Sequence, residues 1–200
     1  MEPASRAYGA ASAQYIELFD DVVQVHADDL DLIDRHLIGA PGIVLDVGCG
    51  PGHLTAHLRS RGVDAIGLDV VPEFIDHARV AHPEGRYEVG SMRRLPVAAC
   101  SVAGILAWYS LIHTPPDELD AVLLELRRVL RPGGTLVAGF FHGGRTAAFA
   151  HQVMTAYSWP VDAFANRLCD AGFEVVDRLQ RPGVDETGRR PQGVVAAVAA

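Results

Sequence analysis

The stretch VLDVGCGPGHLT, from Val44 to Thr55, joins a short apolar run to three closely spaced glycines. A few consecutive apolar residues bounded by glycine are typical of a buried strand, and Gly48, Gly50 and Gly52 then follow at alternate positions. Glycine lets a ligand approach the backbone where any Cβ would block it. Because parallel sheets bind ligands at the carboxyl ends of their strands, this turn is predicted to hold a cofactor.

Apolar runs alternate with helix-like segments along the rest of the chain. Between the runs, apolar residues recur at helical spacing, as in residues 119–130. Such alternation predicts a parallel sheet with helices on both faces. Pro72 is expected to begin a helix, Gly172 to cap one, and Phe173 to open a sixth strand. The other predicted strands lie in residues 43–47, 65–68, 87–89, 102–107, 135–141 and 194–199.

Length and composition predict a single α/β domain over residues 1–200. Two hundred residues with 49% hydrophobic content are enough for one sizeable core. Residues 1–40 are expected to form a lid of two helices over the sheet edge, and residues 41–200 the cofactor-binding core.

Charge and cysteine content restrict the expected partners and compartment. A net charge of −8 disfavours nucleic-acid binding. Three widely spaced cysteines without a C-x-x-C pair predict a reducing, cytoplasmic environment. No signal peptide and no membrane association are expected. A monomer and a homodimer both stay open.

The residues around the glycines separate two kinds of cofactor. A dinucleotide-binding loop reads G-x-G-x-x-G, and here His53 stands where the third glycine would be. Asp46, two residues before the first glycine, would repel a pyrophosphate but attract an ammonium or a sulfonium. S-adenosylmethionine carries both of these cations. Asp69, at the end of the second predicted strand, can accept hydrogen bonds from the ribose of this cofactor or of NAD.

Three classes of function follow from this comparison. A methyltransferase that uses S-adenosylmethionine is favoured. An NAD-dependent oxidoreductase is disfavoured by Asp46 and His53. A non-catalytic cofactor-binding protein is disfavoured by the intact glycine turn with both Asp46 and Asp69.

Five segments between about Val44 and Phe141 carry a family resemblance. They read VLDVGCGPGHLT, GLDVVPEFIDHAR, YEVGSMRRLP, GILAWYSLIHTPP and LLELRRVLRPGGTLVAGF. In this order they resemble the motifs of class I S-adenosylmethionine-dependent methyltransferases, most of all the small bacterial enzymes of the ubiquinone/menaquinone-biosynthesis type. The resemblance implies a Rossmann-like, doubly wound, seven-stranded and mostly parallel sheet, with helices on both faces and the last strand antiparallel.

The resemblance also implies where S-adenosyl-L-methionine and its product S-adenosyl-L-homocysteine would bind. The glycine turn would wrap the methionine part, and Ser91 stands where the family usually has an acid for the adenine amino group. Tyr8 and Tyr15 resemble tyrosines that close over the cofactor, although packing is an equal alternative for each. The implied cofactor-binding residues are Tyr15, Asp46, Gly48, Cys49, Gly50, Gly52, Asp69, Val70, Ser91, Met92, Ala107 and Trp108.

His113 is the first candidate for a general base, because it follows the fourth predicted strand on the cofactor side. Tyr109 is the second candidate and His142 the third. The alternative for His113 is that it packs at the start of the next helix. The acceptor is expected to be a small molecule, walled by Tyr157 and Trp159 unless these side chains pack against the sheet.

No metal is expected. His53 and His57 have the spacing of two zinc ligands on a helix, but Leu54 occupies the place of the glutamate that a metalloprotease would need. Helix packing is the default for both histidines.

Overall fold

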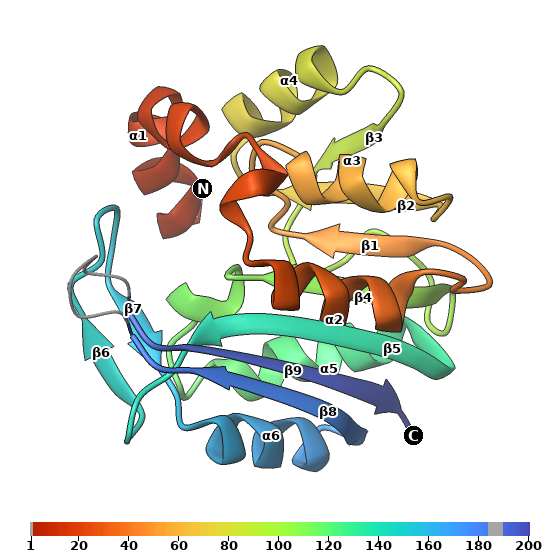
Figure 1. The fold of residues 1–200 in the computed structure, drawn as a ribbon, viewed down its shortest axis with the longest axis vertical. Coiled ribbons are helices and arrows are strands. Elements are labelled where there is room, and N and C mark those ends of the chain that lie inside the picture. The colour runs from red at the N-terminus through yellow and green to blue at the C-terminus, as the bar shows by residue number, and fades with distance from the viewer. Residues whose placement is uncertain (1, 184–189) are drawn as a thin grey trace.

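A seven-stranded sheet forms the centre of the computed structural model, which describes residues 2–183 and 190–200 (Figure 1). The strand order is β3-β2-β1-β4-β5-β9-β8; β1 to β5 pair in parallel, and β9 runs antiparallel to both its neighbours. The predicted mostly parallel sheet with an antiparallel last strand is therefore confirmed. The strands are β1 (Val44–Val47), β2 (Ala65–Asp69), β3 (Arg86–Val89), β4 (Val102–Trp108), β5 (Leu130–Phe141), β8 (Phe173–Arg181) and β9 (Gln192–Ala199).

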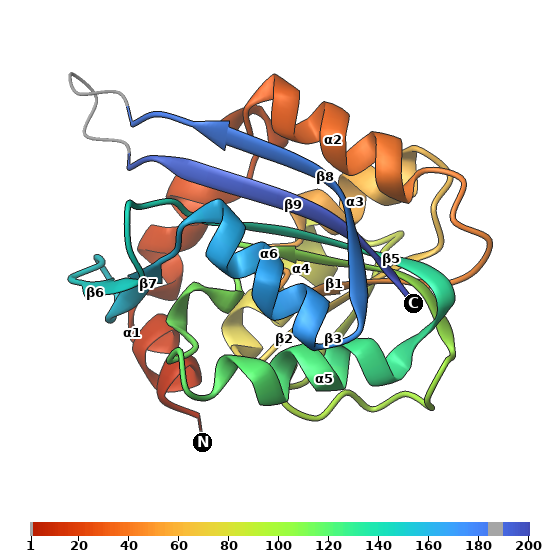
Figure 2. The same cartoon turned by 90° about the horizontal axis from the view of Figure 1, so that it is seen from below.

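Helices cover both faces of this sheet, with α2 and α3 on one face and α5 and α6 on the other (Figure 2). Pro72 begins a helix as predicted, and Gly172, with φ of +85°, follows the end of another. The helices are α1 (Pro3–Phe19), α2 (Ala27–Leu37), α3 (His53–Ser60), α4 (Pro72–Ala81), α5 (Leu119–Val129) and α6 (Val161–Asp170), with short 3-10 helices η1 (Val22–Gln24) and η2 (Leu111–His113).

Successive strand residues enter different cores, which explains why both faces need helices. In β4, Ile105 and Ala107 belong to the buried cluster that includes α5 and α6. Leu106, between them, belongs to the cluster that includes α2 and α3. This alternation is the geometry of a strand. Because both faces are buried, the carboxyl ends of the strands are left as the place for a site.

The second N-terminal helix, α2, does not lie where the sequence predicts. Both were expected over the sheet edge, but α2 packs on a face of the sheet against β4, β5 and β9, where Leu32, Ile33 and Leu37 are buried. Its apolar stripe is wide enough to become part of the core. Only α1 lies beyond the carboxyl ends of the strands, packed against α4.

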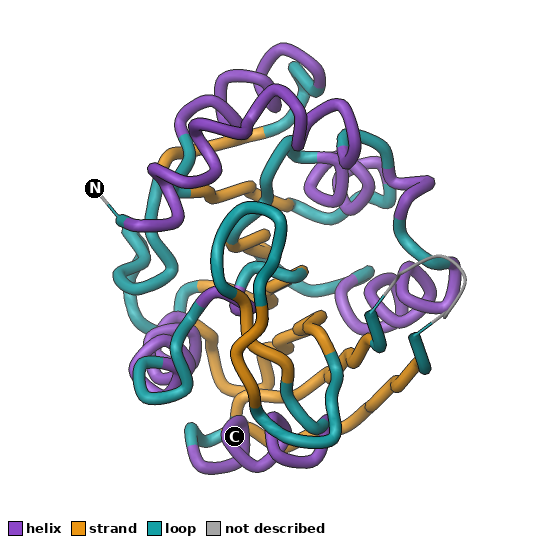
Figure 3. Tube along the Cα trace, turned by 90° about the vertical axis from the view of Figure 1, so that its left-hand side faces the viewer, coloured by secondary structure: helices purple, strands orange, loops and turns teal. Residues whose placement is uncertain are grey.

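A small hairpin, absent from the prediction, crosses the same end of the sheet (Figure 3). It consists of β6 (Ala147–Phe149) and β7 (Ala156–Ser158), which pair antiparallel. Its base is fixed by the backbone of Trp159, whose N–H donates to the carbonyl of Phe141 at 2.9 Å. Three-residue strands are too short for alternation to reveal them.

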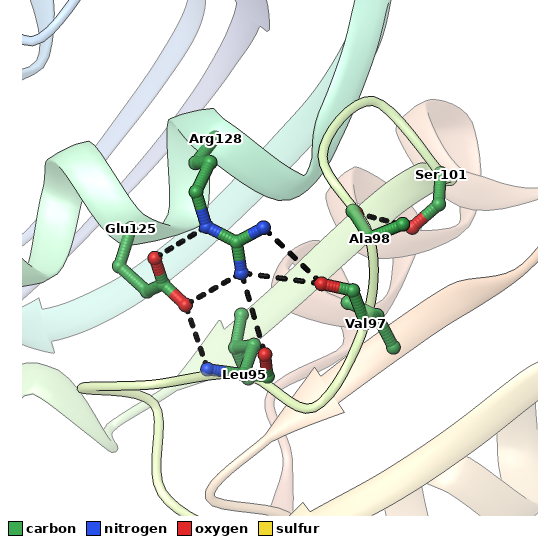
Figure 4. Close-up of polar contacts among 6 residues, drawn as sticks. All are labelled: Leu95, Val97, Ala98, Ser101, Glu125 and Arg128. Atoms are coloured by element: carbon green, nitrogen blue, oxygen red, sulfur yellow. Dashed lines mark hydrogen bonds and ion pairs between the residues drawn. The ribbon is translucent and has the colours of Figure 1, made fainter.

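An ion-paired anchor holds the loop that follows β3 (Figure 4). Glu125 accepts a hydrogen bond from the Leu95 N–H at 2.7 Å and pairs with Arg128 at 2.7 and 2.8 Å. Arg128 also donates to the carbonyls of Leu95 and Val97 at 3.3 and 3.2 Å. The anchor therefore fixes residues 95–97 against α5, just after the segment predicted to contact adenine.

Candidate functional site

A cavity of about 410 Å³ opens at the carboxyl ends of β1, β2 and β4, beneath α1. This volume lies in the range of small-molecule sites, and the position follows the rule for open α/β sheets. The wall includes nine of the residues predicted for cofactor binding or catalysis. They are Tyr15, Gly48, Gly50, Asp69, Val70, Met92, Trp108, Tyr109 and His113.

The first two glycines of the turn provide bare backbone in the cavity wall. Gly48 and Gly50 have φ of +74° and +53°, in the left-handed region that favours glycine. A Cβ on Gly48 would lie 2.3 Å from the Cβ of Ser110, so only glycine fits there. Such a cradle, which a side chain would fill, suits the methionine part of S-adenosylmethionine.

Asp69 joins the glycine turn to the end of β2. Its carboxylate accepts the N–H of Gly50 and the N–H of Val71, each at 2.9 Å. Burial raises the pKa of Asp69, and these backbone hydrogen bonds oppose that rise. Each carboxylate oxygen has a further lone pair, so Asp69 can also accept hydroxyl groups of a ribose.

Asp46 lies behind the turn and does not form part of the cavity wall. Its side chain is buried and accepts the hydroxyl of Thr55, from α3, at 2.6 Å. Burial raises the pKa of Asp46 to about 7. The direct contact expected between Asp46 and a cofactor cation is therefore not part of this geometry, and Asp46 supports the turn through α3.

Four other predicted cofactor residues also lie outside the wall. Cys49 is buried against the face of β2, beside Gly67. Gly52 precedes α3 with φ of +95°, and a Cβ there would meet Tyr87 and Ala78 at 2.8 and 2.9 Å. Each shapes the turn from behind.

Ser91 and Ala107 complete this group. The Ser91 hydroxyl accepts the N–H of Arg93 at 3.1 Å, which folds the loop on itself. Ala107 is fully buried in the core beneath the strand end. We therefore assign no direct ligand contact to either side chain.

Aromatic side chains of α1 close the cavity over the glycine turn. The Tyr15 ring lies over Gly50, with its Cε1 3.8 Å from the position of a Cβ on that glycine. Tyr15 also packs on Phe74 and Tyr8, with ring centroids 5.2 and 5.3 Å apart. Burial raises the pKa of Tyr15 to about 12, so its phenol is neutral at physiological pH.

His113 connects α1 to the hairpin. Its Nδ1 lies 2.8 Å from the carbonyl oxygen of Thr155, and its Nε2 lies 2.7 Å from the hydroxyl of Tyr8. Because a carbonyl only accepts, Nδ1 carries the proton and Nε2 accepts from Tyr8. Burial lowers the pKa of His113, so the imidazole is neutral near pH 7.

Tyr109 combines a strained backbone with an unpaired hydroxyl. Its φ of +52° is uncommon for a residue with a side chain. Among the described residues, its buried hydroxyl has no hydrogen-bond partner. Burial raises the pKa of Tyr109 above its usual range, so the phenol is a poor base at neutral pH. Trp108 packs edge-on against it, with centroids 5.3 Å apart.

Two further candidates, His142 and Trp159, lie away from the cavity. His142 sits behind the hairpin, with Nδ1 3.2 Å from the Trp159 carbonyl and Nε2 2.9 Å from Gln180. Trp159 is buried against Phe164, whereas Tyr157 reaches the cavity wall.

Sequence reasoning missed part of the wall. Phe74, Ser110, Met154 and Thr155 all line the cavity. Phe74 lies on α4, for which the sequence predicts a helix but no site residue. Met154 and Thr155 belong to the hairpin, which no sequence pattern predicts. Ser110 has an indirect signal, because a glycine at position 48 indicates that another residue packs closely against that backbone.

Residues 2–183 and 190–200 contain no group of three or more His, Cys, Asp or Glu side chains that could hold a metal ion. His57 instead bonds Asp34 at 2.7 Å. No helix in these ranges is both long and apolar enough to cross a bilayer.

Comparison with known proteins agrees with this geometry. Residues 44–134 match the family described as "Methyltransferase domain". A malonyl-[acyl-carrier protein] O-methyltransferase of Pseudescherichia vulneris is 30% identical over 132 residues, 66% of this chain and 52% of that protein. A bifunctional biotin-biosynthesis protein of Cellvibrio japonicus is 34% identical over 131 residues, 65% of this chain and 25% of that protein. The chain thus spans about half or less of these relatives.

A solved structure extends the likeness over the whole chain. The 1,6-didemethyltoxoflavin-N1-methyltransferase of Burkholderia thailandensis, bound to 1,6-didemethyltoxoflavin and S-adenosylhomocysteine, superposes with a TM-score of 0.75. The match covers 100% of this chain and 92% of that one at 24% identity, which supports a shared fold. The quinone-biosynthesis subtype stays a prediction. Residues 44–134 thus match the methyltransferase domain family, and the chain as a whole shares the fold of a solved S-adenosylhomocysteine-bound methyltransferase.

Proposed function

We propose that this chain transfers a methyl group from S-adenosylmethionine to a small-molecule acceptor. The cradle of Gly48 and Gly50, tied to Asp69 by the hydrogen bond from the Gly50 N–H, is the observation that carries the proposal. It offers bare backbone for an amino-acid tail beside a carboxylate for a ribose. When bound, the cofactor supplies an activated methyl group, so the protein needs mainly to align and desolvate the acceptor.

The residues of the cavity divide by role in this proposal. Gly48, Gly50 and Asp69 would hold the methionine and ribose parts, with Tyr15 closing over them from α1. Val70 and Met92 would flank the adenine, and Trp108 would line the methyl-transfer face. His113 would accept a proton from the acceptor, since its imidazole is neutral and lines the cavity; Tyr109 is a less suitable base because its phenol stays protonated.

Relatives suggest one specific alternative for the acceptor. The name of the Pseudescherichia vulneris protein points to a malonyl group carried on an acyl-carrier protein. A malonyl thioester therefore belongs in the acceptor panel beside small free molecules.

Cofactor binding is the first experimental test. Isothermal titration should show saturable binding of S-adenosylhomocysteine and none of NADH at the same concentrations. Tight NADH binding without S-adenosylhomocysteine binding would favour an oxidoreductase. Binding of S-adenosylhomocysteine without methyl transfer to any acceptor in a broad panel would favour a non-catalytic binding protein.

Asp69→Asn tests the proposed ribose contact directly. The amide keeps the shape of the side chain but loses its charge, so S-adenosylhomocysteine binding should weaken by about 1–3 kcal/mol, the cost of a lost charge-assisted hydrogen bond. Asp76→Asn, on the exposed side of α4, is the matched control and should bind normally. Equal affinity of the Asp69 variant and wild type would remove the ribose role.

A further inference from the structure

The acceptor end of the cavity is walled by rings. Tyr8 comes from α1, Trp108 ends β4, Tyr109 and His113 follow it, and Tyr157 comes from the hairpin; these five side chains are named the aromatic wall. Neighbouring rings support one another, with centroids 5.4 Å apart for Tyr8 and His113 and 5.3 Å for Trp108 and Tyr109. Aromatic side chains bury a large apolar area, and they pair with another flat ring either offset-stacked or edge-to-face.

Each charged side chain of the cavity already has an ionic partner or a proposed role in cofactor binding. Among described residues, its charged side chains are those of Glu2, Asp69, Arg93 and Glu118. Arg93, the cation of this set, lies 2.5 Å from Glu118 and 3.9 Å from Glu2. An anionic acceptor would thus find no free cation in this wall, and a cationic acceptor would lie beside the sulfonium of the cofactor.

His113 offers one hydrogen-bonding position to a ligand. Its Nδ1–H is committed to the Thr155 carbonyl, so Nε2 is the nitrogen that can accept a hydrogen bond. The Tyr8 hydroxyl now donates to that lone pair at 2.7 Å. A ligand with an O–H or N–H group can make the same hydrogen bond only by replacing the Tyr8 hydroxyl.

From these three observations we propose that the acceptor is a flat, uncharged molecule whose O–H or N–H replaces the Tyr8 hydroxyl at Nε2 of His113. The inference rests on the proposed methyltransferase function and deepens it. The acceptor atom would give its proton to Nε2 and form a bond to the methyl carbon, while the electron pair of the broken carbon–sulfur bond stays on sulfur. The imidazolium would then lose its proton to water.

Matched probes test the class of acceptor. Protein saturated with S-adenosylhomocysteine, whose binding is measured first, is titrated with 2-naphthol, 2-naphthoate and decahydro-2-naphthol. The first is flat and neutral, the second flat and anionic, and the third neutral but not flat. We expect 2-naphthol to bind roughly tenfold or more tightly than either of the others, because an unpaired charge or a puckered ring fits the wall poorly.

The outcomes separate this inference from the proposed function. If S-adenosylhomocysteine binds but the carboxylate or the puckered alcohol binds as well as 2-naphthol, the acceptor class is wrong. The same holds if none of the three binds saturably. If S-adenosylhomocysteine itself does not bind, the proposed function fails first.

Acidification tests the contact at His113. 2-Naphthol stays neutral between about pH 4.5 and 8, whereas a His ordinarily titrates near 6.5. The affinity of the protein for 2-naphthol should therefore fall on acidification, because Nε2 of His113 becomes protonated and can no longer accept a hydrogen bond. The titratable groups beside the imidazole are Tyr8 on α1 and His151 after β6, with ring centroids at 5.4 Å from it in both cases. His113→Gln should abolish this pH dependence, and His151→Gln should keep it.

Tyr8→Phe tests the displacement. The ring stays in place but the hydroxyl that occupies Nε2 is gone, so 2-naphthol should bind as tightly as to wild type or more tightly. A clear loss of affinity in this variant would mean that the acceptor needs the Tyr8 hydroxyl rather than replaces it, and that would overturn the displacement.

Discussion

At the scale of single residues, Gly48 shows why the turn after β1 needs glycine. Gly48 and Gly62 both adopt positive φ, but a Cβ on Gly48 would lie 2.3 Å from that of Ser110, whereas nothing lies within 4 Å at Gly62. Gly62→Ala therefore costs only left-handed strain, about 1–2 kcal/mol. Gly48→Ala adds a clash in the cavity wall, so we expect it to abolish S-adenosylhomocysteine binding in calorimetry while Gly62→Ala binds normally.

A second substitution identifies the cause. Ser110→Gly in the Gly48→Ala background removes the clashing Cβ and should restore part of the binding. Thermal unfolding of all variants shows whether each is folded. Failure of the double variant to bind better than the single one would mean that the close approach to Ser110 is not the reason for glycine.

The place of a residue in the cavity wall was predictable where its type alone implies a geometry. Gly50 and Asp69 are examples, since a glycine turn and an acid at a strand end have few uses. Asp46 was placed on the correct strand, but its distance from the cavity depends on Thr55, which α3 brings beside it. The role of Thr155 depends on a backbone carbonyl, which every residue has, so no sequence signal exists for it.

At the scale of elements, the Glu125–Arg128 anchor is expected to stabilise the loop after β3 in a pH-dependent way. The hydrogen bond from Arg128 lowers the pKa of Glu125 in the folded protein. A carboxyl whose pKa is lowered by folding stabilises the folded protein fully when the pH is above its pKa in the unfolded chain, about 4.3 for Glu. This contribution is lost as the pH falls through the pKa of the carboxyl in the folded protein. Glu125→Gln should therefore cost about 1 kcal/mol at pH 7, with less difference from wild type below pH 4.

Thermal unfolding at pH 7 and at lower pH values measures this effect. One kcal/mol corresponds to about 2–4 °C in Tm for a chain of this size. Glu174→Gln, an exposed carboxylate on β8, serves as the control and should match wild type throughout. A Glu125→Gln deficit that stays constant or grows on acidification would contradict the lowered pKa.

Elements were predictable in proportion to their length and regularity. The stripe of α5 and the alternation of strands with helices are repeated signals, and the structure confirms them. The strands β6 and β7 have three residues each and depend on tertiary contacts for their existence. The position of α2 on the sheet face was missed because an amphipathic helix shows which side it buries, not against which surface.

At the scale of the whole molecule, the fold follows from a pattern distributed over the chain, but long-range polar partners do not. The buried Asp29 of α2 meets Arg181 at the end of β8, 152 residues away, through two hydrogen bonds, one of 2.6 Å. Arg181 also donates to the Gln192 side chain at 2.7 Å. Nothing in the sequence near either partner identifies the other, and yet the pair joins an N-terminal helix to the C-terminal strands.

Two arginines on β8 show what this pair contributes. Arg181→Met would leave the Asp29 carboxylate buried without a partner, which costs about 3–5 kcal/mol. Arg178→Met breaks the pair with Asp162, both partners of which are largely exposed, and should cost at most about 1 kcal/mol. Urea unfolding should therefore separate two substitutions of the same type on one strand. Adding Asp29→Asn to Arg181→Met removes the buried charge and should recover part of the stability. An equal loss of unfolding free energy in Arg181→Met and Arg178→Met would show that the buried pair is no more important than a surface one.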